Sequence, residues 1–227
     1  MTDRKKVGLI RVLTTEDDDF LQAHGRIIES EFPSLSVTSR CIPEQYEGVH
    51  DDETERIAIG KVAAEGRRFA QEGFDAVYIS CAGDPGVRPL QEELSIPVIG
   101  AGIAAAHCAL VWNLPVGVLG ITDDTPREMK QILGTRIVGS LRPEAIHTTL
   151  DLLRPEAADW LTESARQLQK AGAKILVLAC TGLATINAAP MLSQRTGIPV
   201  IDPLRAAGAM LSNILRYGGR KTCLVSD

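Results

Sequence analysis

The chain of 227 residues is long enough to bury a proper core, either as one compact unit or as two small lobes. Its net charge of −5 and pI near 5.5 argue against a nucleic-acid-binding surface, and no stretch is long enough to span a membrane. A hydrophobic content of 44% with only 4% aromatic residues is typical of an α/β protein packed with Ala, Val, Leu and Ile.

Strands and helices are predicted to alternate along the first half of the chain. Short apolar runs predict strands at 6–13, 35–42, 76–79 and 97–99. Polar starts and small-residue stretches predict helices from Thr14–Asp17 to about Phe32, from Asp51 to about Gln71, near 87–94, and over 102–112. Gly60 and Gly66 weaken the second of these helices.

The same pattern starts again at residue 115. Strands are expected at 115–121, at 136–138, in the run that leads to Cys180, and at 199–201. Helices are expected at 126–133, 156–171, 185–196 and 203–217. We expect 139–155 to be a loop with a helical segment.

The alternation of strands and helices predicts an α/β fold with parallel sheets. Because the pattern repeats, we expect two similar Rossmann-like lobes, each a four-stranded parallel sheet flanked by helices, related by a pseudo-two-fold axis. The first lobe is predicted at 1–100, completed by a C-terminal helix within 203–227, and the second at 101–202. No low-complexity linker separates them, so the active site is expected in the cleft between the lobes.

Two cysteines stand in matching positions at the ends of predicted strands. Cys81 and Cys180 each lie eight residues after one glycine and two before another. Ligands of α/β sheets bind just beyond the carboxyl ends of the strands, so the pair predicts a site built from two halves. Cys41, Cys108 and Cys223 have no such context and are expected to be buried, inert thiols.

The cysteines and histidines also bear on the compartment and on metal binding. The five cysteines suggest mostly free thiols in a reducing compartment, and with no signal-peptide pattern at the start we expect a cytosolic protein. No metal is expected, because the sequence has no C-x-x-C and its four histidines lack ligand spacing; these are His24, His50, His107 and His147. A disulfide between Cys81 and Cys180 would need Cα atoms within about 7 Å, which a substrate-sized cleft excludes.

Two features allow a structural as well as a functional interpretation. The run 100–105, with Asp123 about twenty residues on, matches the G-x-G-x-x-A dinucleotide fingerprint. The packing of a small-residue helix against a strand explains these glycines equally well, and the repeated copy at 202–205 lacks them. Asp84 and Asp202 are each expected to hydrogen-bond their own backbone in a turn.

At the two cysteine motifs the chain resembles the aspartate/glutamate/hydantoin racemase superfamily. Ser80-Cys81-Ala82-Gly83-Asp84-Pro85-Gly86 looks like the first motif of its hydantoin racemase branch, and Ala179-Cys180-Thr181-Gly182-Leu183 looks like the second. The resemblance implies cofactor-independent enzymes with two α/β lobes and one cysteine from each lobe facing the stereocentre. The chain departs from glutamate racemases at 82–83 and 181–182, and from many hydantoin racemases at 11–15.

We therefore expect a racemase that inverts a stereocentre next to a carbonyl, acting on hydantoins or related amino-acid derivatives. One cysteine thiolate would remove the proton and the other, as a thiol, would return one to the opposite face. The alternatives are an aspartate/glutamate-type racemase, a decarboxylase or isomerase of the superfamily, and a non-catalytic small-molecule-binding or thiol-redox protein.

The expected site residues fall into two groups. Cys81 and Cys180 are expected to be catalytic. The substrate-binding residues are expected to be the strand-end threonines and the neighbours of the two cysteines, namely Thr14, Thr15, Ser80, Ala82, Gly83, Asp84, Thr122, Thr181 and Gly182. Arg11 and Arg88 are placed where they can reach the cleft. We expect a small-molecule substrate and a homo-oligomer, with no metal, no cofactor, and no nucleic-acid or membrane partner.

Overall fold

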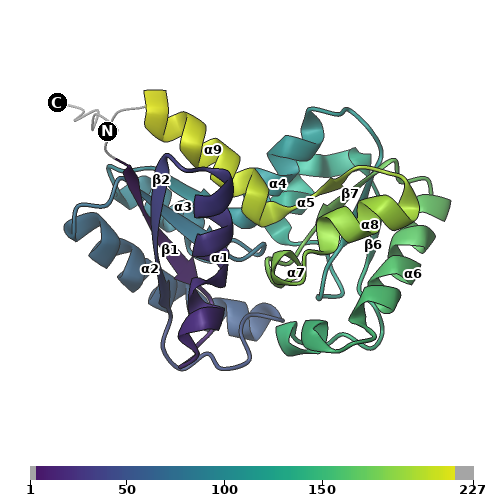
Figure 1. The fold of residues 1–227 in the computed structure, drawn as a ribbon, viewed down its shortest axis with the longest axis horizontal. Helices are drawn as coiled ribbons and strands as arrows, with labels where there is room; N and C mark the ends of the chain where they lie inside the picture. Colours follow the sequence, from purple (N-terminus) through teal and green to yellow (C-terminus); the bar gives the residue numbers. More distant parts are fainter. Residues whose placement is uncertain (1–3, 218–227) are drawn as a thin grey trace.

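The computed structural model describes residues 4–217, so Cys223 and the rest of 218–227 lie outside the described residues. It contains two four-stranded parallel sheets flanked by helices, which confirms the predicted α/β fold (Figure 1). The first sheet has the order β2-β1-β3-β4, made by β1 (Lys5–Arg11), β2 (Leu35–Cys41), β3 (Ala76–Ser80) and β4 (Val98–Gly100). The second has the order β6-β5-β7-β8, made by β5 (Val116–Leu119), β6 (Ile137–Leu141), β7 (Ile175–Leu178) and β8 (Val200–Ile201). Because the orders match, β3 and β7 occupy equivalent places.

Each sheet is covered on both faces, as a parallel sheet requires. On the first sheet, α1 (Asp18–Glu31) packs on one face, and α2 (Asp52–Gln71) and α3 (Val87–Glu93) pack on the other. On the second sheet, α6 (Ala157–Lys170) and α8 (Ala188–Thr196) share one face, and α5 (Arg127–Leu133) lies on the other. Four separate apolar clusters result, one on each face of each sheet.

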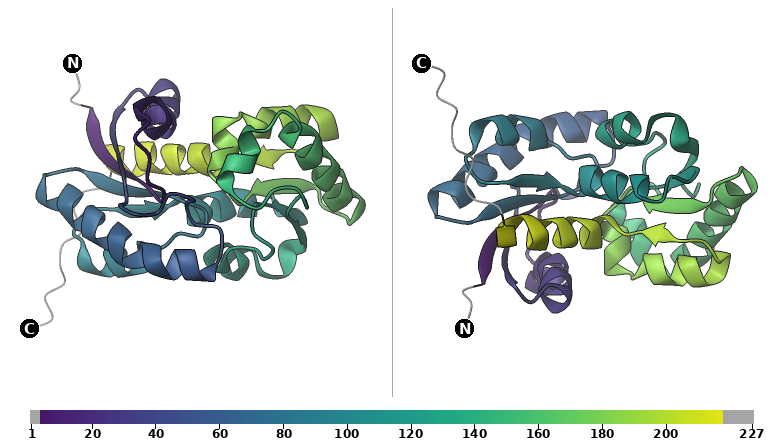
Figure 2. Two further views of the ribbon diagram at one scale, coloured as in Figure 1. Left: turned by 90° about the horizontal axis from the view of Figure 1, so that it is seen from below. Right: turned by 90° about the horizontal axis from the view of Figure 1, so that it is seen from above.

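Two helices join the halves of the molecule. In α4 (Ala101–Leu110), Ala101 and Ala104 pack into the core of the first sheet, whereas Ala105 and Ala109 pack into that of the second. The last described helix, α9 (Pro203–Tyr217), leaves the second half after β8 and packs back along the first sheet beside α1 (Figures 1 and 2). The alanine-rich sequence of α4 is therefore explained by contact with two sheets at once.

The chain differs from the predicted elements at two places in the second half, and a third expectation there is met. The helix expected at 185–196 is two helices, α7 (Gly182–Thr185) and α8, because Asn187 adopts a left-handed conformation between them with φ of 52°. Strand β6 continues to Leu141, beyond the predicted end, after the 3-10 turn η1 (Gly134–Arg136). The helical segment expected within 139–155 is the 3-10 helix η2 (Thr149–Leu153), which a capping box stabilises.

The first half follows the predictions more closely. α1 begins at Asp18 with Asp17 as its N-cap, and α2 begins at Asp52 with a capping box between Asp51 and Thr54. The glycines of α2 do not interrupt it, since the helix runs unbroken to Gln71. None of the helices in the described part of the chain combines the length and apolar character needed to cross a bilayer.

Candidate active site

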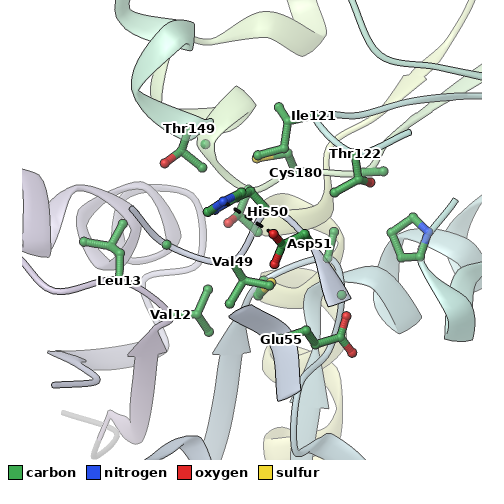
Figure 3. Close-up of a pocket in the computed structure, with 18 of the residues that line it drawn as sticks. Val12, Leu13, Val49, His50, Asp51, Glu55, Ile121, Thr122, Thr149 and Cys180 are labelled. Atoms are coloured by element: carbon green, nitrogen blue, oxygen red, sulfur yellow. Dashed lines mark ion pairs between the residues drawn. The ribbon is translucent and has the colours of Figure 1, made fainter. Parts of the chain in front are cut away.

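A cavity of about 910 Å³ lies at the carboxyl ends of both sheets and is lined by residues of both halves. Cys81 and Cys180 both form part of its wall, as the predicted two-part site requires. Figure 3 shows Val49, Asp51 and Glu55 of the first half across the cavity from Ile121 and Cys180 of the second. The matching sheet orders explain this meeting, because each cysteine follows the third strand of its half along the chain.

Cys81 directly follows β3 and is 9% exposed. Burial is the main cause that raises its thiol pKa, and the carboxylates of Asp84 and Glu55 raise it further. The N–H of Gly83 donates toward the sulfur and opposes this shift. At neutral pH this environment favours the protonated thiol.

Cys180 lies two residues after the end of β7 and is 7% exposed. Burial raises the pKa of its thiol to about 11, less far than for Cys81. Two backbone N–H groups, from Gly182 and Leu183, donate toward the sulfur, and the nearby Arg11 guanidinium also favours the thiolate. Of the two thiols, Cys180 therefore ionises more readily.

Asp84, expected to bind substrate, lies behind the cavity wall. Its two carboxylate oxygens accept hydrogen bonds from the N–H groups of Gly102 and Ile103 at 2.9 and 2.6 Å. Burial raises its pKa to about 8, and these two bonds oppose the shift. The carboxylate thus anchors the start of α4 next to the Cys81 turn.

The glycines of the fingerprint-like run are explained by this anchor. A Cβ on Gly100 would lie 2.1 Å from Asp84 Oδ1, and one on Gly102 would lie 2.1 Å from the carbonyl oxygen of Ala82. Neither position tolerates a side chain without movement of its neighbours. The G-x-G pattern therefore has a packing role at this place.

The other predicted substrate-binding residues divide into two sets. The cavity wall includes six of them, Ser80, Ala82, Gly83, Thr122, Thr181 and Gly182. It does not include Thr14, whose hydroxyl bonds the carbonyl of Ile42 at 2.6 Å and the N–H of Gln45 at 2.8 Å. It also does not include Thr15, whose hydroxyl accepts from the N–H of Asp17. These two threonines order the loops beside the cavity.

Sequence analysis missed a buried histidine that links the two halves. His24 of α1 is 1% exposed; its Nδ1 lies 2.8 Å from Ser80 Oγ and its Nε2 lies 2.9 Å from Thr185 Oγ1. Burial holds its pKa well below the usual value. A signal was present, since His24 is four residues before the buried Ile28 on the apolar face of α1.

Three further polar residues of the wall were also missed, or noted only in passing. Glu55 lies in the first turn of α2, half-buried, and burial raises its pKa. His50 precedes α2, and its Nδ1 is buried with no hydrogen-bond partner among the described residues. Arg11, the last residue of β1, is 3% exposed. Arg88, in contrast, is directed to an ion pair with Glu128 and does not line the cavity.

Within residues 4–217, no group of three or more His, Cys, Asp or Glu side chains is placed to hold a metal ion. The expectation of an enzyme that needs neither metal nor cofactor remains a prediction. The chemistry available in the cavity wall is that of two thiols with backbone donors, three guanidinium groups, one lysine ammonium group, one imidazole and several carboxyl groups.

Comparison with solved structures supports the fold. The allantoin racemase of Klebsiella pneumoniae has a TM-score of 0.78 at 23% identity, with 96% of this chain and 90% of that chain covered. The allantoin racemase of Pseudomonas fluorescens has a TM-score of 0.76 at 22% identity, with 97% and 94% covered. At this level of identity the two matches establish a shared architecture.

Sequence comparison identifies the family. The family model described as Asp/Glu/Hydantoin racemase matches residues 20–211. The hydantoin racemase of Paenarthrobacter aurescens is 27% identical over 86% of this chain and 81% of its own length. That of Rhizobium meliloti is 30% identical over 78% and 73%. With its fold and its paired cysteines in one cavity, the chain belongs to the Asp/Glu/Hydantoin racemase family and is an isomerase of the racemase type.

Proposed function

We propose that the enzyme interconverts the enantiomers of a hydantoin or a related amino-acid derivative through a two-cysteine mechanism without a cofactor. One observation carries the proposal: Cys81 and Cys180 follow equivalent strands and line the same cavity from opposite halves. Inversion of a carbon requires an acid and a base on opposite sides of it, and a duplicated fold supplies both.

In the proposed reaction, one cysteine thiolate takes the proton from the carbon next to a carbonyl, and the C–H electron pair moves to the carbonyl oxygen as an enolate. The other cysteine then gives its thiol proton to the opposite face and becomes the thiolate. We assign the backbone N–H groups of Ala82 and Thr181, which follow the cysteines in the cavity wall, to the enolate oxygen. The roles reverse for the other enantiomer.

A neutral ring is the substrate class that we favour. Apolar side chains form much of the wall, among them Val12, Val49, Ile121 and Leu152, and they suit a ring with an apolar substituent. A hydantoin presents carbonyl and N–H groups that backbone donors and Glu55 can satisfy. A free amino acid brings two charges, each of which needs a partner when it leaves water.

The test compares enantiopure 5-substituted hydantoins with free aspartate and glutamate. Loss of optical rotation and deuterium incorporation at the stereocentre in D₂O are the two measurements. Fast exchange of a hydantoin supports the assignment; faster exchange of aspartate or glutamate than of every hydantoin would overturn the neutral-ring class.

Mild oxidation of the same protein distinguishes a racemase from a thiol-redox protein. A thiol-redox protein would form a reversible disulfide between Cys81 and Cys180 under mild oxidation and would racemise nothing. Because the mechanism needs free thiols, we further propose a reducing, cytosolic location. The homo-oligomer remains a prediction.

A further inference from the structure

Glu55 lies in the first turn of α2, on the first-half side of the cavity (Figure 3). A Cβ added to Gly83 would lie 3.4 Å from Glu55 Oε2 and 3.6 Å from Cys81 Sγ. The carboxylate oxygen and the thiol therefore border the same point of the cavity wall, beside the backbone of Gly83.

The Glu55 carboxylate has no hydrogen-bond or ion-pair partner in the described part of the chain. Two other acids at the start of the same helix do have partners. Asp51 accepts a hydrogen bond from the N–H of Thr54 at 2.8 Å. Glu53 pairs with Arg56 at 2.7 Å. Glu55 is also half-buried, whereas Asp51 and Glu53 are exposed. A carboxylate that is partly removed from water is stabilised by an N–H donor, so a bound molecule that supplies one is favoured here.

The equivalent place beside Cys180 is apolar. A Cβ added to Gly182 would lie 3.0 Å from Leu152 Cδ1 and 3.4 Å from Cys180 Sγ. Leu152 is a buried residue of η2 that lines the cavity. Gly83 and Gly182 each stand two residues after their cysteine, so the same backbone position faces a carboxylate in one half and a methyl group in the other. The wall of the cavity is thus polar beside one thiol and apolar beside the other.

The stereocentre of a hydantoin has two neighbours in the ring, a carbonyl carbon and a nitrogen that carries one hydrogen. When Cys81 takes or delivers the proton of the stereocentre, both neighbours lie near the turn that contains Gly83. The carbonyl oxygen becomes the enolate, for which the backbone N–H groups of Ala82 and Thr181 are proposed. The ring N–H is a donor and needs an acceptor, and an ionised carboxylate such as that of Glu55 only accepts.

We propose that Glu55 determines the ring specificity of the enzyme by accepting a hydrogen bond from the ring N–H next to the stereocentre. The inference rests on the proposed function above. It gives the ring one orientation, with its carbonyl oxygen toward the backbone donors and its N–H toward α2. Because the bond is present both in the bound substrate and in the enolate, Glu55 acts on binding more than on the chemical step. A ring with an oxygen in place of this N–H would set two acceptors against each other.

The test compares two rings in the wild-type enzyme and in Glu55 variants. 5-Benzylhydantoin carries the N–H, and the oxazolidinedione with the same 5-benzyl group carries an oxygen in its place. Circular dichroism follows the racemisation of each ring, with the uncatalysed rate subtracted, and gives kcat and KM. The variants are Glu55→Gln, which keeps a neutral acceptor, and Glu55→Ala, which keeps none. Asp52→Asn is the matched control, because it removes an exposed carboxylate from the same helical turn. Thermal unfolding checks the fold of each variant.

We expect Glu55→Gln to reduce kcat/KM for the hydantoin by about tenfold, and Glu55→Ala by about thirtyfold, mostly through a higher KM. The oxazolidinedione should change by less than about threefold in either variant, since it makes no such bond. Asp52→Asn should leave the ratio of the two substrates within about twofold of the wild-type ratio.

Equal losses for the two rings would overturn the proposal, because they would mean that Glu55 acts through Cys81 or through the fold. If neither Glu55 variant folds, the wild-type KM values decide, and a KM for the oxazolidinedione no higher than that for the hydantoin overturns the proposal. Racemisation of hydantoins with equal losses leaves the proposed function intact. If the wild-type enzyme racemises no hydantoin, the proposed function fails and this inference fails with it.

Discussion

The turns that follow Cys81 and Cys180 begin alike and then diverge. After Cys81, the chain passes through left-handed residues at Asp84 and Gly86 before α3 begins, and the carboxylate of Asp84 is buried beside the thiol. After Cys180, α7 begins at Gly182 without such a detour. The sulfur of Cys81 therefore receives one backbone N–H and has an acid behind it, whereas that of Cys180 receives two.

The difference separates two contributions to the site. Matching sheets place two thiols on opposite sides of one cavity, and this is a property of the repeated strands. Burial raises the pKa of both thiols, and loop residues that are not repeated, such as Asp84, make the two shifts unequal. The two thiols can therefore occupy equivalent positions and still differ in acid strength.

Removal of either thiol should have the largest effect. Cys81→Ser and Cys180→Ser should each reduce racemisation at least about a thousandfold, because an alcohol is a far weaker acid and base than a thiol at neutral pH. Polarimetry on an enantiopure substrate measures the loss, and Cys108→Ser, a half-buried thiol outside this cavity, should retain activity. One cysteine variant with near wild-type racemisation would contradict the two-base mechanism.

The Asp84 anchor distinguishes the first turn from the second and is open to a steric test. Gly102→Ala would place a Cβ 2.1 Å from the Ala82 carbonyl oxygen, and the free energy of unfolding should fall by about 2–3 kcal/mol. Gly60→Ala in α2 meets nothing within 4 Å and should raise it by about 0.5–1 kcal/mol. Chemical denaturation measures the unfolding free energy of both variants. If Gly102→Ala and Gly60→Ala change it equally, the backbone around the Asp84 carboxylate is not tightly packed.

His24 joins the two turns, and its burial predicts a pH dependence. The folded-state pKa lies well below the unfolded value of about 6.5, so below that pH the unfolded chain binds the extra proton. The stability that His24 contributes is thus complete above about pH 6.5, and it decreases by about 1.4 kcal/mol per pH unit as the pH falls toward the folded pKa.

His24→Gln keeps a donor and an acceptor but does not titrate in this range. Denaturation curves at a series of pH values should show a shallower acid dependence for the variant than for the wild type. Parallel profiles between about pH 5 and 6.5 would mean that His24 is protonated in the folded protein.

A smaller effect is expected from the hydroxyl that links the second turn to the first. Thr181 Oγ1 donates to the buried carbonyl oxygen of Ser80 at 3.0 Å, and Thr181→Val should cost about 1 kcal/mol of unfolding free energy. Thr122→Val removes an exposed hydroxyl bond to Asp124 and should cost less than about 0.5 kcal/mol. If the two variants are equally stable, the bond between the turns contributes little.

The sequence contained enough to predict the sheets and the cysteine pair. Buried parallel strands are continuous apolar runs, and the repeat of such a run before Cys81 and Cys180 predicted both the fold and the common cavity. Sequence patterns did not predict the break in the helix expected at 185–196, because one backbone angle decides it. Asparagine tolerates the left-handed conformation, but a single asparagine at 187 was not enough to predict that α7 and α8 separate there.

The substrate contacts were harder to predict because they depend on side chains from distant elements. Thr14 and Thr15 follow a strand, as cavity residues should, but their hydroxyls are taken by neighbouring loops. His24 comes from the middle of a helix, and its two hydroxyl partners are 56 and 161 residues away in the chain. A pattern along the chain cannot show bonds of that span.

The return of α9 to the first sheet has a consequence for biosynthesis. Leu204, Leu211 and Leu215 complete the same apolar cluster as Val7 and Leu9. The ribosome therefore finishes the first sheet long before it makes the helix that covers one of its faces. At ordinary elongation rates the delay is on the order of ten seconds, during which a nascent chain carries an uncovered apolar surface, the kind of surface that chaperones bind.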